Sequence, residues 1–288
     1  MHDYTLIGNP LGHSMSPMIH DRLFALRNRE AAYSLTALPA EELAVREPEL
    51  RKLSGYNITI PHKMNIIPFL DELDETAKRY NSVNCVANHD GRAIGYNTDC
   101  VGFLRSVQEM PLDGRVLLIG CGGVGRMMAI EAALHGAKEL VLMVLPSDQP
   151  LAEALREELA AAAPETAVSI ELTGSDREGG LGHFDLLMNA CPVGMYPKTN
   201  ACPISEKQLE LCDHVFDVIY NPTETQLIRM AKAMGKPAVG GAAMLVWQAV
   251  RAHEIWDGDT YTNEEVQGII RELEETVNRD FPVQEGSI

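Results

Sequence analysis

The sequence predicts an α/β protein of two domains, and three observations lead to this prediction. Short apolar runs alternate with helical patterns along the chain, which is typical of strands covered by helices. The chain has 288 residues, more than one ordinary hydrophobic core needs. A glycine-rich loop, Gly120-Cys121-Gly122-Gly123-Val124-Gly125, lies between a buried-strand pattern and a helical pattern. We therefore expect one α/β domain with a mostly parallel sheet and a second domain built around that loop.

The N-terminal half is predicted to hold its own sheet. Apolar runs predict strands at residues 4–7, 33–37, 56–60 and 83–88, and Asp90-Gly91 predicts a hairpin turn into a strand at 93–96. Ser16 is expected to cap a helix at 17–27, because proline fits the first helical position. A helix at 99–108 leads into Pro111-Leu112-Asp113-Gly114, which is typical of a linker. We place the domain boundary near residue 110.

The C-terminal half begins again with a buried strand. Residues 115–119 are nearly all apolar, and the glycine loop, a helix at 124–135 and a strand at 140–144 complete a βαβ unit. Further strands are predicted at 168–172, 186–189, 215–218 and 238–239, and helices at 152–163, 242–255 and 263–278.

Composition and charge exclude several classes of partner. The net charge of -17 would repel nucleic acid and anionic membranes, so an anionic small substrate would need hydrogen-bond donors or a local cation such as Lys63. The six cysteines form no CxxC pair and the nine histidines show no HExxH spacing, so we expect reduced thiols and no metal site. No signal peptide or membrane-spanning run is apparent, and a cytoplasmic location is expected.

The glycine loop predicts a dinucleotide site of the Rossmann type. Glycines at 120, 122, 123 and 125 allow a tight turn and a close approach of backbone to a pyrophosphate, whose charge would lie at the helix N-terminus beside Val124. The alternative is a glycine-rich connection that binds nothing. At the end of the following strand an acidic residue favours NAD and an arginine favours NADP. This chain has no arginine there, and Asp148 is the ionisable residue near that corner.

Two polar corners precede the glycine loop. The first is Asn57-Ile58-Thr59-Ile60-Pro61-His62-Lys63, and the second is Asn97-Thr98-Asp99. A lysine and a carboxylate ahead of a nucleotide loop suggest redox chemistry on a small hydroxylated molecule. The alternatives are a solvated Lys63 and an Asp99 that caps a helix. His13 and His62 are interpreted as structural.

The motifs resemble those of the shikimate dehydrogenase family, including its quinate/shikimate branch, from Ile7 to about Gly258. The likeness rests on the order of six motifs: the loop from Gly8 to Pro17 with its two serines, Asn57 to Lys63 (NxTxPHK), Gly95 to Asp99 (GxNTD), Asn189 to Met195 (similar to NATPVGM), Asp217 to Pro222 (DxxYNP) and Met244 to Gln248 (MLxxQ). The resemblance implies a substrate-binding and catalytic domain of residues 1–110 plus 242–288, a Rossmann-type domain of residues 111–241, and a substrate cleft between them.

The same resemblance implies the residue roles. Ser14, Ser16, Thr59, Asn84, Tyr220 and Gln248 would bind a polyhydroxylated cyclic acid, and Met195 and Gly241 would join the glycine loop and Asp148 at the cofactor. Lys63, kept protonated by Asp99, would give a proton to the substrate oxygen during ketone reduction. Oxidation would need a neutral lysine, so its rate is expected to rise toward alkaline pH.

The cofactor side departs from the family pattern. Most members carry Asn-Arg-Thr where this chain has Val144-Leu145-Pro146, and the arginine holds the NADP phosphate. NADP and NAD therefore both remain open, and Arg126 or Arg156 could still approach a phosphate. The leading interpretation is a shikimate dehydrogenase that is a monomer or homodimer. The alternatives are an NAD-preferring quinate/shikimate dehydrogenase and a ligand-binding or regulatory homologue without turnover.

Overall fold

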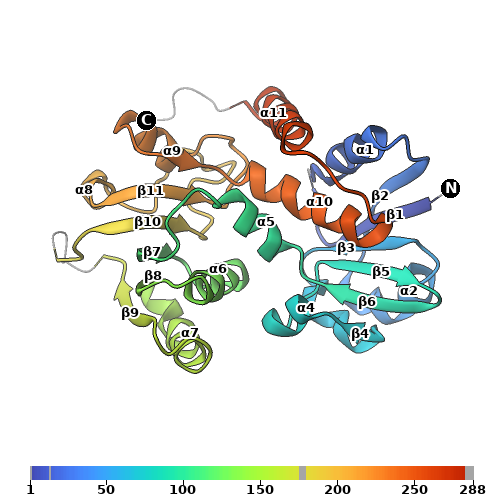
Figure 1. Ribbon diagram of the computed structural model, residues 1–288, viewed down its shortest axis with the longest axis horizontal. Coiled ribbons are helices and arrows are strands. Elements are labelled where there is room, and N and C mark those ends of the chain that lie inside the picture. The colour runs from blue at the N-terminus through green and yellow to red at the C-terminus, as the bar shows by residue number, and fades with distance from the viewer. Residues whose placement is uncertain (1, 13, 175–179, 283–288) are drawn as a thin grey trace. The chain divides into compact units, whose positions relative to one another are not determined.

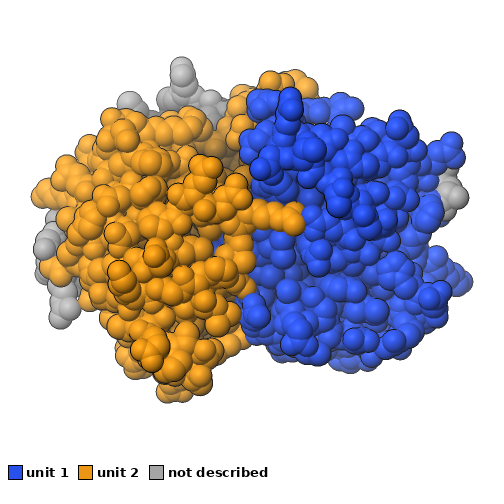
Figure 2. Space-filling view, viewed as in Figure 1, with its two compact units in different colours: residues 1–103, 245–273 blue, residues 104–244, 274–288 orange. Residues whose placement is uncertain are grey.

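The computed structural model describes residues 2–12, 14–174 and 180–282. The chain forms two compact units, which Figure 2 shows in different colours. Unit 1 comprises residues 1–103 and 245–273, and unit 2 comprises residues 104–244 and 274–288. The predicted domain limits and the cleft stay predictions. Within the described ranges, no helix is both long and apolar enough to cross a membrane.

Unit 1 is built on a mixed six-stranded sheet, which confirms the predicted α/β class. The strand order is β2 (Ala31–Ala37), β1 (His2–Gly8), β3 (Gly55–Ile58), β5 (Cys85–His89), β6 (Arg92–Tyr96) and β4 (Glu72–Leu73) (Figure 1). Three of the five strand pairings are parallel, and the β3–β5 and β5–β6 pairings are antiparallel. Asp90 and Gly91 both have positive φ at the β5–β6 turn, so the predicted hairpin is confirmed.

Seven helices of the described chain lie wholly or mostly in unit 1. They are α1 (Ser16–Leu26), α2 (Leu43–Leu50), α3 (His62–Asn65), α4 (Glu75–Tyr80), α5 (Asp99–Ser106), α10 (Ala242–Asp257) and α11 (Asn263–Asp280), with 3-10 turns at Ala40–Glu42 and Ile67–Phe69. The prediction that Ser16 caps α1 is wrong. Met15 occupies the cap position with near-helical backbone angles, so the chain enters the helix one residue early and Ser16 is its first residue. The Ser14 hydroxyl accepts the Ser16 N–H at 3.3 Å instead.

Helix α10 packs against the sheet through its tryptophan. The Trp256 indole donates to the Val86 carbonyl at 2.9 Å and stacks on the Tyr4 ring at a centroid distance of 4.5 Å. The two rings belong to a buried apolar cluster that also contains Phe24 and Cys85. Burial of this cluster removes aromatic surface from water and fixes α10 on unit 1.

Two fully buried histidines join α10 to α1. His20 Nδ1 lies 3.0 Å from His253 Nε2, and His253 Nδ1 lies 3.1 Å from the Tyr261 hydroxyl. Because Tyr261 donates its proton to the Leu23 carbonyl, it accepts from His253, and His253 Nε2 in turn accepts from His20. Burial lowers the pKa of both imidazoles, that of His253 to about 3. Both rings are therefore neutral in the folded protein at physiological pH.

Unit 2 is a parallel six-stranded sheet with the strand order of a Rossmann domain. The order is β12 (Ala238–Val239), β11 (Cys212–Asp217), β10 (Phe184–Asn189), β7 (Arg115–Ile119), β8 (Glu139–Val144) and β9 (Ala167–Leu172), and every pairing is parallel. Its helices are α6 (Gly123–Leu134), α7 (Gln149–Ala162), α8 (Glu206–Glu210) and α9 (Gln226–Ala233) (Figure 1). The chain reverses its direction of winding between β7 and β10. Open α/β sheets bind ligands at this switch point.

Candidate active site

Lys63 lies on α3, a single helical turn that directly follows the Pro61 corner. Strand β3 ends at Ile58, two residues before the predicted end, because the chain turns at Thr59, whose carbonyl accepts the His62 N–H at 3.0 Å. The Lys63 carbonyl accepts the Val83 N–H at 2.8 Å. This bond holds the lysine backbone to the segment that leads into Asn84.

Asp99 is the first residue of α5, and Asn97 sets its backbone. The Asn97 side chain accepts the Asp99 N–H at 3.1 Å and donates to the Ser82 carbonyl at 3.1 Å. The Asn97 N–H donates to the Thr76 hydroxyl at 2.9 Å. A buried amide with both ends satisfied has one orientation, so the corner that carries Asp99 is fixed.

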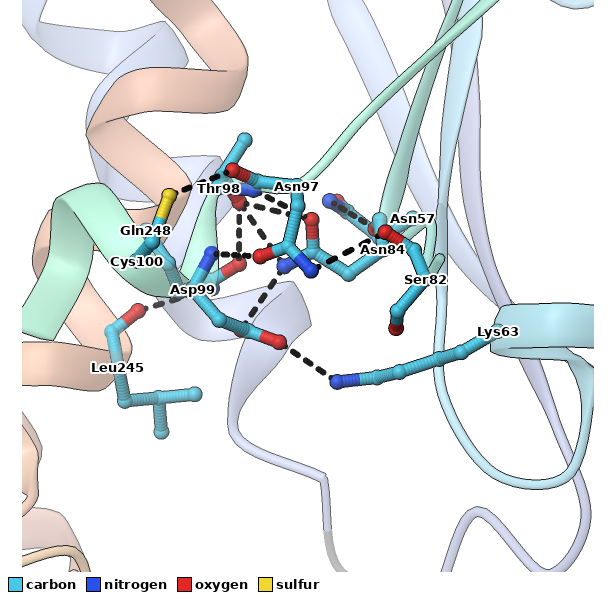
Figure 3. Close-up of polar contacts among 10 residues, drawn as sticks. All are labelled: Asn57, Lys63, Ser82, Asn84, Asn97, Thr98, Asp99, Cys100, Leu245 and Gln248. Atoms are coloured by element: carbon cyan, nitrogen blue, oxygen red, sulfur yellow. Dashed lines mark hydrogen bonds and ion pairs between the residues drawn. The ribbon is translucent and has the colours of Figure 1, made fainter. Parts of the chain in front are cut away.

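The structure brings Lys63, Asp99 and Asn84 together (Figure 3). Lys63 Nζ lies 2.6 Å from Asp99 Oδ2, and Asn84 Nδ2 donates to Asp99 Oδ1 at 2.8 Å. The side chains of Lys63 and Asp99 are 27% and 19% exposed. A partly exposed ion pair contributes about 1 kcal/mol or less to stability. The stability of the fold therefore depends little on this pair.

Thr98 connects this group to Gln248, which belongs to α10. The Thr98 N–H donates to Asn84 Oδ1 at 2.7 Å, and its hydroxyl accepts from Asn84 Nδ2 at 3.0 Å. The same hydroxyl lies 3.3 Å from Gln248 Oε1, and Gln248 Nε2 donates to the Leu245 carbonyl at 2.9 Å (Figure 3). Gln248 therefore joins Lys63, Asp99, Asn84 and Thr98 in one hydrogen-bonded set, here called the Lys63 group. Nearly two hundred residues separate Gln248 from Lys63 in sequence.

Sequence reasoning assigned no role to Thr98, Asn57 or Tyr33. The Asn57 amide donates to the Asn84 carbonyl at 3.2 Å and accepts from the Tyr33 hydroxyl at 2.8 Å. Thr98 and Asn57 are buried. Asn57 stands in the NxTxPHK motif and Thr98 in the GxNTD motif, so the motifs could have indicated both residues. Tyr33 lies in no such motif.

Ser14, Ser16 and Thr59 also lie in unit 1, and the Ser16 side chain hydrogen bonds to Tyr33. Ser14 and Thr59 are half-buried and Ser16 is 8% exposed. Within the described residues, no hydrogen bond joins any of the three to Lys63. Their membership in one substrate pocket stays a prediction. Tyr220 belongs to unit 2, where burial raises its pKa, and its contact with substrate also stays a prediction.

Of the two histidines that the sequence analysis interprets as structural, His62 lies within the described residues. His62 is fully buried, and its Nε2 lies 2.6 Å from the Leu38 carbonyl. This bond anchors the start of α3, which agrees with a structural role. His13 lies outside the described residues.

In unit 2 the glycine loop has the backbone geometry that the fingerprint requires. Gly120 has φ of +86°, and a Cβ on Gly125 would lie 2.2 Å from the Gly120 carbonyl oxygen, so α6 packs directly on the loop. A Cβ on Gly122 or Gly123 would meet no described atom within 4 Å. The N-terminus of the twelve-residue α6 is thus open to an anion. These residues fit the pyrophosphate of a dinucleotide.

The other predicted cofactor residues lie on loops that follow neighbouring strands. A Cβ on Gly120 would lie 3.2 Å from Cys191 Cβ, so the loop after β10 adjoins the glycine loop. Met195 is half exposed on that loop. Gly241 precedes α10, and its N–H donates to the Ile219 carbonyl at 3.0 Å. Met195 and Gly241 thus both lie on segments that follow the carboxyl ends of parallel strands.

No arginine stands at the end of β8, and the two arginines considered for the NADP phosphate already have partners. Leu145 is 56% exposed at that corner, and Asp148 follows in a 3-10 turn (Pro146–Asp148) whose Asp148 carbonyl lies 4.0 Å from Cys121 Sγ. Arg126 forms an ion pair with Glu158, and Arg156 forms one with Glu153 at 2.7 Å. Both arginines are thus engaged by carboxylates.

Among the residues that the structure describes, two groups of side chains have the spacing of metal ligands. The first group consists of His253, Asp257 and Asp259. His253 forms hydrogen bonds through both ring nitrogens, and Arg29 forms ion pairs with both aspartates. In the second, His183 Nε2 bonds Asp213 at 2.9 Å, and Asp185 accepts the Arg115 N–H at 2.6 Å. Each member of the two groups thus already has a protein partner.

Comparison with known proteins gives consistent relatives. Residues 6–86 match a family model described as the shikimate dehydrogenase substrate binding domain. The chain is 36% identical over 277 residues to a Bacillus cereus protein named shikimate dehydrogenase (NADP(+)), which covers 94% of this chain and 98% of that protein. The similar solved structures include two with bound ligands. Shikimate 5-dehydrogenase of Listeria monocytogenes in complex with shikimate and NAD has a TM-score of 0.83 at 28% identity, covering 94% and 96% of the two chains. The Thermus thermophilus enzyme in complex with NADP(H) and shikimate has a TM-score of 0.80 at 30% identity, covering 95% and 100%.

Proposed function

Because the chain belongs to the shikimate dehydrogenase family, and is therefore an oxidoreductase acting on a CH–OH group with a nicotinamide dinucleotide, we propose its reaction as follows. It reduces 3-dehydroshikimate to shikimate reversibly, a step of aromatic amino acid biosynthesis. The observation that carries this proposal is the 2.6 Å contact between Lys63 and Asp99, with Asn84 on the other carboxylate oxygen.

The mechanism assigns the proton to Lys63. The bound dinucleotide supplies or accepts the hydride, and the protein must deliver or remove a proton at the substrate oxygen. The Lys63 ammonium donates that proton in the reductive direction and stabilises the developing alkoxide. Asp99 holds the ammonium in one place, and Asn84 holds Asp99.

The substrate contacts belong to the same proposal. We assign them to Ser14, Ser16, Thr59, Asn84, Tyr220 and Gln248. A cyclic acid with several hydroxyls needs neutral donors and acceptors, and each rejects an analogue that leaves it unpaired. The buried network from Asn84 through Thr98 to Gln248 supports this assignment, because it presents amides in fixed orientations.

Removal of the Lys63 ammonium tests the proposal. Lys63→Ala should keep substrate affinity within about tenfold and lower kcat at least about a hundredfold, the usual scale of acid–base catalysis. Steady-state absorbance of the reduced cofactor gives both quantities. The control is Lys52→Ala, which removes an exposed lysine of the same unit and should leave the rate unchanged. A Lys63→Ala protein with more than about a tenth of the wild-type kcat would refute the role of Lys63.

A second candidate, an NAD-preferring quinate/shikimate dehydrogenase, is favoured by the end of β8. Leu145 stands where the family's phosphate-binding arginine is expected, and Arg126 and Arg156 are already paired with glutamates. A phosphate would have to displace one of those carboxylates. The backbone carbonyl of Asp148 lies 4.0 Å from Cys121 Sγ of the glycine loop, and we assign to its carboxylate the hydrogen bonds from the ribose hydroxyls.

A matrix of two substrates and two cofactors separates the candidates. Initial rates with shikimate or quinate, each with NADP or NAD, identify the preferred pair. Higher kcat/KM with NAD would support the second candidate, and higher kcat/KM with NADP would refute it. Binding without turnover for all four pairs would establish the ligand-binding homologue, against which the retained Lys63–Asp99 pair argues.

The remaining features complete the proposal. Six free cysteines support a reducing, cytoplasmic location. The strongly acidic net charge supports small-molecule partners rather than nucleic acid or membranes. We propose a monomer or homodimer.

A further inference from the structure

Strands β10 and β11 end side by side in two buried polar residues. Asn189 and Asp217 are paired in the sheet register, and neither is exposed. They stand at the carboxyl ends of their strands, next to the switch point. A fully buried carboxylate is costly unless several groups satisfy it.

Three neutral donors from three segments satisfy Asp217. Asn189 Nδ2 donates to Oδ1 at 2.9 Å, and the Ile219 N–H donates to the same oxygen at 3.1 Å. The Thr225 hydroxyl donates to Oδ2 at 2.7 Å. Burial raises the Asp217 pKa, and these hydrogen bonds oppose the shift. One carboxylate thus ties together the ends of β10 and β11 and the start of α9.

The tied segments lead into the loop that carries Met195, a residue predicted to bind the cofactor. Asn189 also accepts the Cys191 N–H at 3.1 Å, and its carbonyl accepts the Val218 N–H at 3.1 Å. Further along, the Tyr196 N–H donates to the Asn221 carbonyl at 3.0 Å. Residues 189–196 and 218–221 therefore form one hydrogen-bonded assembly, here called the β10–β11 loop pair.

A steric constraint makes this assembly sensitive to small displacements. A Cβ on Gly241 would lie 2.0 Å from the Val218 carbonyl oxygen, so the backbone of Gly241 packs directly on the loop pair. The loop after β10 also adjoins Gly120. A shift of the loop pair would therefore move the surfaces on both sides of it.

We propose that Asp217 is a positioning residue for the cofactor. Its carboxylate holds the β10–β11 loop pair in the geometry that receives the nicotinamide end of the dinucleotide. This inference rests on the proposed function, because it takes the loop pair to be a cofactor surface. Asp217 touches neither substrate nor cofactor in this account and acts through Asn189 and Ile219.

The experiment measures the Kd of reduced cofactor, NADH and NADPH, by fluorescence titration. Asp217→Asn keeps the shape but replaces one acceptor by an NH2 donor, and should weaken binding at least about tenfold. Thr225→Val removes one donor and should weaken it about threefold, whereas Thr225→Ser keeps the hydroxyl and should restore wild-type affinity within about twofold. Asp213→Asn, at the exposed opposite end of β11, is the matched control and should leave the Kd unchanged.

The Kd distinguishes positioning from simple loss of folded protein. Loss of folded protein lowers the amplitude of the titration without changing its midpoint. An Asp217→Asn protein that binds both cofactors within about twofold of wild type would overturn the proposal. Should that variant fail to fold, equal affinities of Thr225→Val and Thr225→Ser would overturn it instead. Failure of the proposed function has a different signature: wild-type protein binds reduced cofactor but does not oxidise shikimate, and the affinity comparison still decides the role of Asp217.

Discussion

The predicted site of unit 1 is built from side chains, whereas that of unit 2 is built from backbone. In unit 1 the Lys63 group consists of side chains that hydrogen bond to one another, from Lys63 through Asp99, Asn84 and Thr98 to Gln248. In unit 2 the glycine loop offers bare backbone at Gly122 and Gly123. The comparison teaches that the first site is vulnerable to the loss of a functional group. The second is vulnerable to the addition of an atom.

The largest expected effect is on the side-chain site. Asp99→Asn should lower kcat by about a hundredfold to a thousandfold, because an amide cannot accept from both Lys63 and Asn84 while neutralising the ammonium. Steady-state kinetics measures this change. Asp3→Asn, an exposed carboxylate of the same unit, is the control. If Asp99→Asn retained wild-type kcat, as Asp3→Asn should, the hydrogen bonds of Asp99 in the Lys63 group would not contribute to catalysis.

The next effect separates two glycines of the backbone site. Gly125→Ala would place a methyl group 2.2 Å from the Gly120 carbonyl, so we expect a loss of about 3 kcal/mol in stability together with weaker cofactor binding. Gly122→Ala meets no described atom within 4 Å, so it should keep the melting temperature and weaken only cofactor binding. Calorimetry and cofactor titration measure the two effects. Equal melting temperatures for the two variants would contradict the packing argument.

Acid should destabilise unit 1 through its buried histidines. The folded pKa of His253, about 3, lies below its ordinary value of 6.5, so the unfolded chain takes up the proton first. Stability is therefore complete above about pH 6.5 and falls below it, by about 2 kcal/mol at about pH 5 for His253. His20, whose pKa is also lowered, adds to the loss in the same direction.

Tryptophan fluorescence measures this loss in unit 1 alone. Both tryptophans of the chain, Trp247 and Trp256, lie on α10 within that unit. Urea unfolding followed at about pH 7.5 and about pH 5 gives the difference in free energy. The variant with both His20→Leu and His253→Leu should lose most of the pH dependence, and an unchanged dependence would assign the acid sensitivity to other groups.

The smallest effect concerns cofactor choice. Leu145→Arg would place a guanidinium at the exposed corner after β8, and should raise the ratio of kcat/KM for NADP to that for NAD about tenfold. Leu145→Lys is the matched control, since it adds a charge without the bidentate fork. A ratio unchanged in both variants would show that the corner does not face the ribose.

Much of the fold followed from sequence periodicity, and the exceptions have physical causes. The strand at 115–119 was predicted with its observed bounds, because a parallel strand buried on both faces is a continuous apolar run. The two-residue edge strand at 238–239 was also predicted with its observed bounds. Helix α2 was missed because it contains Pro48, which normally interrupts a helix. Helix α3 was missed because four residues hold no periodicity.

The site divides in the same way. The Lys63–Asp99 pair was predicted from motif resemblance, and the contact between the two side chains is present. Thr98 and Asn57 were passed over although they stand in those motifs, because a buried hydroxyl or amide has no sequence mark that separates a connecting role from a ligand role. The hydrogen-bonding roles of Tyr33 and Asp217 depend on which strands become neighbours in the sheets. Only the folded sheets reveal that.

The discontinuity of unit 1 has a consequence for synthesis on the ribosome. The segment of residues 1–103 emerges with Lys63, Asn84 and Asp99, but Gln248 and Trp256 follow only after all of residues 104–244 have been translated. Until then the nascent chain lacks one of the two partners of the Thr98 hydroxyl, Gln248, and the indole of Trp256 that packs on the sheet of unit 1. The earliest-made part of the enzyme is therefore among the last to be finished.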